Sequence, residues 1–389
     1  MSVGIDDISF YTSNYYLDLK SLADVHNIEK DKFYSGIGQE KMGIVAADED
    51  VVTMAANAAL TVLDGVDNDC ISTLMFATET GIDQSKAAGV YVHGLLGLSS
   101  RCRVVELKQA CYSATAAIQM ACALVARQPD KKVLVIASDI ARYDLNSSGE
   151  ATQGCGAIAI LVSANPRILE IHPESGNYTE DVMDFWRPNY RSTALVDGKY
   201  STKIYLKSLK QAWLHYQEVS GAQFEDMDYF CYHLPFTRMA EKSQSQMARL
   251  TKTDTSPEKM NAMIEPSLFY NRIIGNSYTA SMYIGLNSLL DNAKEDLTGK
   301  RVALFSYGSG CVAEFYTGTV MPGYQQWLHR KKHQQLLNNR SELSYSEYLE
   351  LYHFEYPTDG GDHQFPEQTT GQFRLAGISQ HKRIYKARE

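Results

Sequence analysis

The stretch Lys132–Ser138 (KVLVIAS) decides the fold class, because a related apolar run recurs at Lys300–Ser306 (KRVALFS). Short runs rich in Val, Ile and Leu are typical of strands buried in a sheet. A glycine-led apolar run follows each copy, at Gly154–Val162 after the first and at Gly310–Val320 after the second. The sequence therefore contains a weak internal repeat of one α/β unit.

The segments before each copy extend this repeat. Strand-like runs at Ile71–Ala77 (ISTLMFA) and Met227–His233 (MDYFCYH) correspond, as do small-residue helices predicted at Ser113–Ala126 and Ser277–Leu290. The first half also predicts a helix at Ser85–Leu96 and a strand at Arg103–Leu107. Alternating strands and helices indicate an α/β architecture. We expect two similar halves, residues 1–165 and 166–389, with the functional site between them. From about Gln325 the second half continues as a polar helical extension with an irregular end.

Composition excludes several classes of protein. The 389 residues include 37 Lys and Arg against 46 Asp and Glu, a net charge of −9, which argues against nucleic acid or an anionic membrane as a partner. The N-terminal segment MSVGIDDISF lacks the features of a signal peptide, and no apolar run reaches the roughly 18 residues needed to span a bilayer. Seven cysteines without any Cys-x-x-Cys spacing indicate reduced thiols. These features predict a cytoplasmic protein.

Cys111 is the cysteine best placed for chemistry. It lies in KQACYSAT, between a predicted strand and a predicted helix. The positive end of a helix dipole at this junction is expected to lower the pKa of the thiol, and small neighbours would let a substrate approach the sulfur. The alternative is a buried structural cysteine.

Glu79 and His233 end corresponding strands of the two halves, in FATET and CYHLPF. Ligands of α/β proteins bind at the carboxyl ends of strands, so both side chains are expected to face one cleft. Partial burial would raise the pKa of Glu79 and make it a usable general base. A surface or helix-capping acid and a core histidine with satisfied hydrogen bonds remain the alternatives.

Three further patterns carry weaker signals. Asn276 in IGNSYTAS takes the place in the second half that Cys111 holds in the first, and a helix N-cap is its alternative role. The glycines of SYGSGC could expose N–H groups to an oxyanion, or form a plain turn. His329 and His333 have metal-ligand spacing, but three cationic residues separate them, so a solvated helix face is expected. The sequence lacks Walker, GxGxxG and zinc-type patterns.

Together, ATET with Glu79, KQACYSAT with Cys111, YHLPFTRM with His233, IGNSYTAS and FSYGSGCVAEFY resemble the bacterial 3-hydroxy-3-methylglutaryl-coenzyme A (HMG-CoA) synthase family. Further matching segments are GIGQ, TEDVMDFWRP, LVDGKYS and LLNNRSEL, and the resemblance runs from the first residue to about Tyr352. It implies the thiolase-like fold, a five-layered αβαβα arrangement of two pseudo-symmetric halves. It also implies a homodimer.

The resemblance implies an acyltransferase of the mevalonate pathway that condenses acetyl-CoA with acetoacetyl-CoA and water, giving HMG-CoA and CoA. Cys111 matches the nucleophile, Glu79 the general acid/base and His233 the residue that orients acetoacetyl-CoA. No cofactor or metal is implied, since the CoA thioesters are substrates. Backbone N–H groups near Cys111 and Ser309 are expected to stabilise an enolate. Positions matching the substrate pocket are Tyr143, Asn146, Thr152, Ser201, Asn276 and Ser309, and those matching CoA phosphate contacts are Lys242 and Arg238.

Some positions depart from the family pattern. Thr12-Ser13 replaces the usual Val-Pro, NSSGEATQGCG replaces NSGGEPTQGAG, WRPNY replaces WRPTG, and FTRMAEK replaces FTKMGKK, which puts Glu241 where a lysine is usual. A ketoacyl synthase of the same fold is the second enzymatic interpretation, but those enzymes pair the cysteine with two histidines or with His and Asn. A non-enzymatic acyl-CoA-binding or scaffold protein would have no reason to keep Glu79, Cys111 and His233 together.

Overall fold

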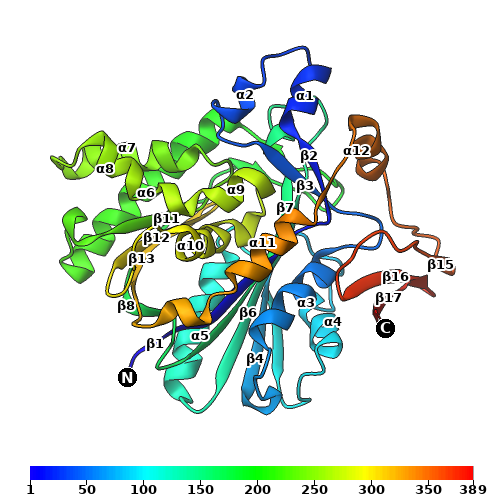
Figure 1. The fold of residues 1–389 in the computed structure, drawn as a ribbon, viewed down its shortest axis with the longest axis horizontal. Coiled ribbons are helices and arrows are strands. Elements are labelled where there is room, and N and C mark those ends of the chain that lie inside the picture. Colours follow the sequence, from blue (N-terminus) through cyan, green and yellow to red (C-terminus); the bar gives the residue numbers. More distant parts are fainter. Residues whose placement is uncertain (389) are drawn as a thin grey trace.

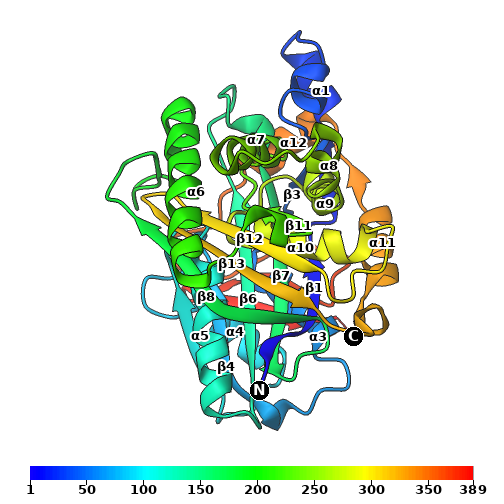
Figure 2. The ribbon, with the colours of Figure 1, turned by 90° about the vertical axis from the view of Figure 1, so that its left-hand side faces the viewer.

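A computed structural model describes residues 1–388 of the chain (Figures 1 and 2). Nine strands form one mixed sheet in the order β11-β12-β13-β8-β1-β7-β6-β4-β5. Their bounds are β1 Val3–Tyr11, β4 Ile71–Ala77, β5 Arg103–Leu107, β6 Lys132–Ala141, β7 Gly154–Ala164, β8 Leu169–Thr179, β11 Tyr229–Tyr232, β12 Arg301–Gly308 and β13 Val312–Val320. Within residues 1–388, no helix combines the length and apolarity that crossing a membrane requires.

The sheet consists of two similar halves that meet at its centre. β1 is followed outward by β7, β6 and β4, and β8 is followed outward by β13, β12 and β11. The strands predicted to correspond along the chain therefore occupy mirrored places, which confirms the internal repeat. β5 extends the first half by one edge strand.

The two halves join through a short contact between β1 and β8. Only Gly4 with Glu170 and Ile5 with Leu169 pair there. A Cβ atom at Gly4 would lie 2.0 Å from the carbonyl oxygen of Leu169. The absence of a side chain at Gly4 is therefore what lets the two backbones approach.

Helices cover the sheet and fill the space between its halves, giving five layers (Figure 2). Alternate residues along one strand serve different layers because side chains in a strand point to opposite faces. In β6, Val133 packs with the central helices and Leu134 with an outer one; in β12, Val302 and Ala303 divide in the same way. The outer helices are α3 Val51–Val62 and α4 Ala88–Leu95 on one side and α6 Gly198–Ser220 and α7 Met239–Thr251 on the other, and the central pair is α5 Ser113–Arg127 and α10 Ser281–Asn292.

Smaller elements surround this core. One three-stranded sheet holds β14, β2 and β3, and β9 pairs with β10. These strands span β2 Tyr15–Asp18, β3 Lys41–Ile44, β9 Phe185–Trp186, β10 Leu195–Val196 and β14 Ser341–Glu342; the remaining helices are α1 Leu19–Val25, α2 Asp31–Tyr34, α8 Pro257–Ala262, α9 Phe269–Ile274, α11 Arg330–Asn338 and α12 Tyr345–Tyr352.

Two predicted helices begin later than expected. The carboxylate of Asp83 accepts hydrogen bonds from the N–H groups of Ser85 and Lys86, and this turn delays α4 to Ala88. Before α10, Tyr278 has a φ of +44°, which is incompatible with an α-helix. A 3-10 turn at Tyr278–Ala280 therefore precedes α10.

The irregular end predicted for the chain is wrong. β15 His363–Gln364, β16 Phe373–Ser379 and β17 Lys382–Ala387 form a three-stranded antiparallel sheet. Phe373 joins the core beneath α3, and its backbone N–H and C=O both bond to the side-chain amide of Asn57 in that helix. The Gly- and Pro-rich composition of this segment gives no strand signal, because the β16–β17 hairpin is stabilised by the contact of Phe373 with α3.

The solvated face predicted for His329 and His333 is wrong for His333, which is 1% exposed. Its Nδ1 lies 2.6 Å from Oδ2 of Asp291 and its Nε2 lies 3.0 Å from Oγ of Ser9. This order of groups resembles a hydrolase triad, but Ser9 is fully buried in β1. The hydrogen bonds of His333 to Ser9 and Asp291 instead stabilise the packing of α11 against the core. His329 bonds separately to Asp7.

Candidate active site

Cys111 lies in the turn between β5 and α5, directly across from Glu79, which follows β4. The thiol Sγ is 3.0 Å from Oε1 of Glu79. The turn is held tightly, because Ala110 has a φ of +44° and the Oγ of Ser113 accepts the N–H of Gln109. Sulfur and carboxylate are thus in direct contact, as a nucleophile and its base require.

Burial and mutual repulsion set the protonation of this pair. Burial, together with the nearby charge of Asp139, raises the pKa of Glu79 to about 8. Burial and the charge of Glu79 raise the pKa of Cys111 well above its ordinary value. The predicted lowering of the thiol pKa by the helix dipole is therefore wrong: desolvation and a carboxylate 3.0 Å away outweigh the helix end.

Asp139 fixes the loop that carries Glu79, and sequence reasoning missed it. It lies in β6, is fully buried, and through Oδ1 accepts the N–H groups of Glu79 and Thr80, each at 2.9 Å. Its Oδ2 accepts the N–H of Thr279 from the second half at 3.1 Å. An acid inside the apolar run VLVIASDIA was the available signal.

His233 follows β11 and lines the same cavity from the second half. Its N–H donates to the C=O of Phe305 at 2.8 Å, and its own C=O accepts the hydroxyl of Tyr205 at 2.8 Å. The residue is 4% exposed, and burial lowers the pKa of its imidazole to about 3. Burial therefore favours the neutral ring near pH 7.

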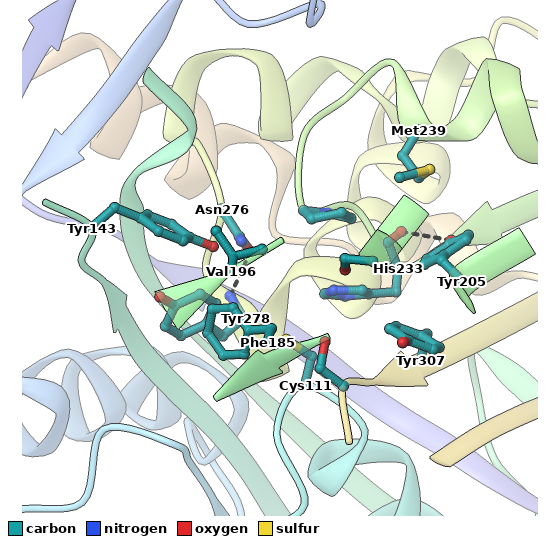
Figure 3. A pocket seen from close by; sticks show the side chains of 13 residues that line it. Cys111, Tyr143, Phe185, Val196, Tyr205, His233, Met239, Asn276, Tyr278 and Tyr307 are labelled. Carbon is teal, nitrogen blue, oxygen red and sulfur yellow. Dashed lines mark hydrogen bonds between the residues drawn. The ribbon is translucent and has the colours of Figure 1, made fainter. Parts of the chain in front are cut away.

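A pocket opens above Cys111 (Figure 3). Tyr143, Phe185 and Tyr278 line one side, and His233, Tyr205 and Tyr307 the other, with the cysteine between them. Six of the predicted site residues line it, namely Cys111, Tyr143, Ser201, His233, Asn276 and Ser309. The aromatic lining was not predicted, because nothing in the local sequence distinguishes these rings from core residues.

Other predicted residues lie outside this pocket. Asn146 lines a second hollow with His26 and Glu150. The hydroxyl of Thr152 donates to the C=O of Gly149 at 2.7 Å, and its own C=O accepts the N–H of Asn276, a residue of the pocket lining, at 3.2 Å.

The two predicted phosphate contacts have protein partners. The guanidinium of Arg238 donates through Nε to Glu241 at 2.8 Å and also to the C=O of Ser35. The ammonium of Lys242 lies 5.0 Å from the centre of the Phe236 ring and is exposed. Lys242 is therefore the freer of the two cations.

In the glycine turn Ser306–Cys311, the N–H of Gly310 bonds to a side chain of the protein. Gly310 adopts a φ of +114°, and its N–H donates to Oδ1 of Asp184 at 2.9 Å. The hydroxyls of Tyr307 and Ser201 donate to Oδ2 of the same carboxylate, at 2.6 and 3.1 Å. The N–H of Gly310 is therefore committed to Asp184. No group of metal-ligating side chains occurs among residues 1–388.

Fold and site define a class of protein: a two-halved α/β enzyme in which a cysteine and a histidine line one pocket and a carboxylate contacts the cysteine. The family model for the hydroxymethylglutaryl-coenzyme A synthase N terminal matches residues 1–167, and the C-terminal model matches residues 172–260 and 250–356. The chain belongs to the HMG-CoA synthase family, whose members are acyl-transferring condensing enzymes of thiolase-like fold.

Individual relatives agree. The hydroxymethylglutaryl-CoA synthase of Enterococcus faecalis is 44% identical over 92% of this chain and 94% of its own. The polyketide biosynthesis 3-hydroxy-3-methylglutaryl-ACP synthase PksG of Bacillus subtilis is 36% identical over 90% and 88%. An HMG-CoA synthase crystallised with CoA covers 100% of both chains, with 42% identity and a TM-score of 0.95.

Proposed function

We propose that this enzyme condenses acetyl-CoA with acetoacetyl-CoA and water to form HMG-CoA and CoA, the step that feeds the mevalonate route to isoprenoids. The observation that carries the proposal is the 3.0 Å contact between the Cys111 thiol and the Glu79 carboxylate, beside a pocket lined by His233. A nucleophile, a base of raised pKa and a neutral imidazole are the groups this condensation needs.

The first half-reaction is an acyl transfer. The Cys111 sulfur attacks the acetyl thioester carbonyl, its proton passes to Glu79 and then to the departing CoA sulfur, and the acetyl group stays on Cys111. One thioester replaces another, so this step is nearly balanced in energy. The raised pKa of Glu79 suits it to accept the thiol proton and return it.

The second half-reaction forms the carbon–carbon bond. Glu79 removes a proton from the acetyl methyl group, and the enolate attacks the ketone carbon of acetoacetyl-CoA while His233 hydrogen-bonds the ketone oxygen. The new alkoxide takes the proton from Glu79. Water then cleaves the thioester to Cys111, releasing HMG-CoA and the free thiol.

The pocket residues orient these substrates in our proposal. Tyr143, Ser201, Asn276 and Ser309 line the cavity and offer hydroxyl and amide groups to the acyl chain. Thr152 supports the wall, and Lys242 is the cation left for the CoA phosphates. Arg238 would have to leave Glu241 to join it. Asn146 lies in the second hollow, so a substrate contact there needs a rearrangement of its loop.

Radiolabelled acetyl-CoA tests the nucleophile. We expect the wild type to carry label on the peptide containing Cys111 and Cys111→Ser to carry none. Cys122→Ser is the matched control, since Cys122 lies on helix α5, which follows Cys111 in the chain, and outside the pocket. Label retained by Cys111→Ser would overturn the assignment. Loss of acetoacetyl-CoA on addition of acetyl-CoA then measures the complete reaction.

We further infer a homodimer formed along the edge of the first half. The outer edge of β5 carries no partner strand within residues 1–388. Three apolar side chains are exposed on β5 and its neighbouring helices: Val90, Val105 and Met120. An unpaired edge beside exposed apolar groups favours association with a second copy. Val105→Glu should lower the mass measured by light scattering from that of a dimer to that of a monomer, whereas Val219→Glu, an exposed control on α6, should not.

The boundary between the two halves and the cellular location of the enzyme are also proposals. We infer that the halves divide near residue 165, within the connection of β7 to β8. We also infer a cytoplasmic enzyme without a bound cofactor, since the proposed chemistry requires a reduced Cys111 and uses CoA thioesters as substrates. All seven cysteines are free thiols in the structure.

A further inference from the structure

The side chain of His233 presents only one of its ring nitrogens to the pocket. Nδ1 lies 2.9 Å from Oγ of Ser281, the first residue of α10. The ring itself lines the cavity beside Tyr205 and Tyr307 (Figure 3). Nε2 is thus the nitrogen available to a substrate, and its role depends on which nitrogen holds the single proton of the neutral ring.

The hydrogen bonds of Ser281 determine where that proton lies. The N–H of Leu234 donates to Oγ of Ser281 at 3.3 Å, so this oxygen already accepts one hydrogen bond. Ser281 is fully buried, and the only other partner of its Oγ within residues 1–388 is Nδ1 of His233. If Nδ1 carried the proton, Oγ would accept twice and its own hydrogen would have no acceptor. A buried donor without a partner is costly, so the hydroxyl donates to Nδ1.

The surroundings oppose a second proton on the ring. No carboxylate forms an ion pair or hydrogen bond with His233 in the described chain. Ser281 begins the 12-residue helix α10, whose positive end faces the imidazole. A helix N-terminus that keeps a catalytic histidine neutral, so that it acts as a hydrogen-bond donor, is a known arrangement in triosephosphate isomerase.

We propose that Ser281 is a positioning residue that, with the Leu234 N–H, holds His233 in the Nε2–H tautomer, so that the ring donates a hydrogen bond to the carbonyl oxygen of the acyl-CoA in the pocket. The inference deepens the role proposed for His233 and rests on it. It also gives a role to the serine at the start of α10, which lies beside the end of β11. There its hydroxyl keeps the single proton of the His233 ring on Nε2.

Nitrogen NMR of the wild type tests the tautomer without any substitution in Ser281. Protein labelled with ¹⁵N-histidine is examined at pH 7, and the His233 resonances are assigned by their loss in His233→Gln. We expect a protonated Nε2 and an unprotonated Nδ1. A proton on Nδ1, or an imidazolium, would overturn the proposal.

Kinetics test the positioning role. Ser281→Ala should mix the two tautomers in the NMR spectrum and raise KM for acetoacetyl-CoA about tenfold, while Cys111 acetylation stays within about twofold of wild type. Ser281→Thr, which keeps the hydroxyl, should restore the wild-type spectrum. Ser288→Ala is the matched control, because it removes another buried hydroxyl of α10, one bonded to the C=O of Pro266.

The two proposals fail in different ways. An unchanged KM or an unchanged tautomer in Ser281→Ala would overturn the role of Ser281. Failure of the wild type to label Cys111 with acetyl-CoA would overturn the proposed reaction and leave the NMR result standing.

Discussion

Replacing Glu79 by glutamine should separate the two chemical steps and lower the pKa of the Cys111 thiol. Glu79→Gln keeps the shape of the side chain but removes the charge 3.0 Å from the sulfur. At an effective dielectric of about 20, two unit charges at this distance repel by about 5 kcal/mol, equivalent to roughly 4 pKa units. Solvent reaching the half-buried pair weakens this repulsion, so we expect a fall of about 1 to 3 units.

Alkylation measures this shift. The rate of iodoacetamide modification of Cys111 is followed against pH by peptide mass spectrometry, and its inflection should move to lower pH in Glu79→Gln. Glu241→Gln changes the net charge equally at an exposed site and should leave the inflection in place. An inflection at the same or a higher pH in Glu79→Gln would refute the view that this carboxylate raises the thiol pKa.

The same variant tests the base. Glu79→Gln should still acquire an acetyl group from acetyl-CoA, because the lowered pKa of Cys111 supplies a thiolate without a proton acceptor. It should form HMG-CoA about 10² to 10⁴ times more slowly, since it has no base for the methyl proton. In the wild type the base must be ionised, so the rate of condensation should rise as pH increases toward about 8. Normal turnover by Glu79→Gln would remove Glu79 from this step.

Three further predictions concern stability. Gly4→Ala should destabilise the fold by about 2 kcal/mol or more in urea titrations, because its Cβ would collide with the Leu169 carbonyl oxygen, 2.0 Å away. His333→Ala should cost about 3 kcal/mol by breaking the buried pair with Asp291, and a loss below about 0.5 kcal/mol would contradict that role. Burial beside Asp48 raises the pKa of Glu49 to about 8, so the folded state binds this proton more tightly than the unfolded chain and loses stability as pH rises from about 4.5 to 8. Glu49→Gln should therefore be more stable than wild type at pH 8, by about 2 to 4 kcal/mol, and the difference should shrink toward pH 5.

The strands, and the correspondence between those of the two halves, could be predicted because each strand is marked by its own apolar run in the sequence. An apolar run such as KVLVIAS must be buried wherever it lies, and its copy in the second half must be buried in the same way. The C-terminal hairpin escaped prediction, since Phe373 and its neighbours become a strand only against α3. The start of α10 escaped for a related reason: the left-handed φ of Tyr278 belongs to a turn packed between the two halves.

Protonation was the part of the site that the sequence misjudged. A strand–helix junction alone favours a thiolate at Cys111, whereas a carboxylate 32 positions earlier in the chain contacts the sulfur and reverses the direction. Burial likewise disfavours the charged form of the His233 imidazole, which its place at a strand end does not reveal. The free energy of a buried charge depends on everything around it, and most of that surrounds it only after folding.

The sequence by itself determined the architecture and the candidate reacting groups, because apolar periodicity and residue type can be read directly from the chain. Cys111, Glu79 and His233 could be named from their places at strand ends. Only the tertiary structure decided how these side chains are arranged and protonated. The 3.0 Å contact, the Asp139 and Asp184 networks, the aromatic pocket and the link from Ser281 to His233 each join segments far apart in the chain. Such contacts depend on distances that no stretch of sequence contains, and those distances set the protonation on which the chemistry depends.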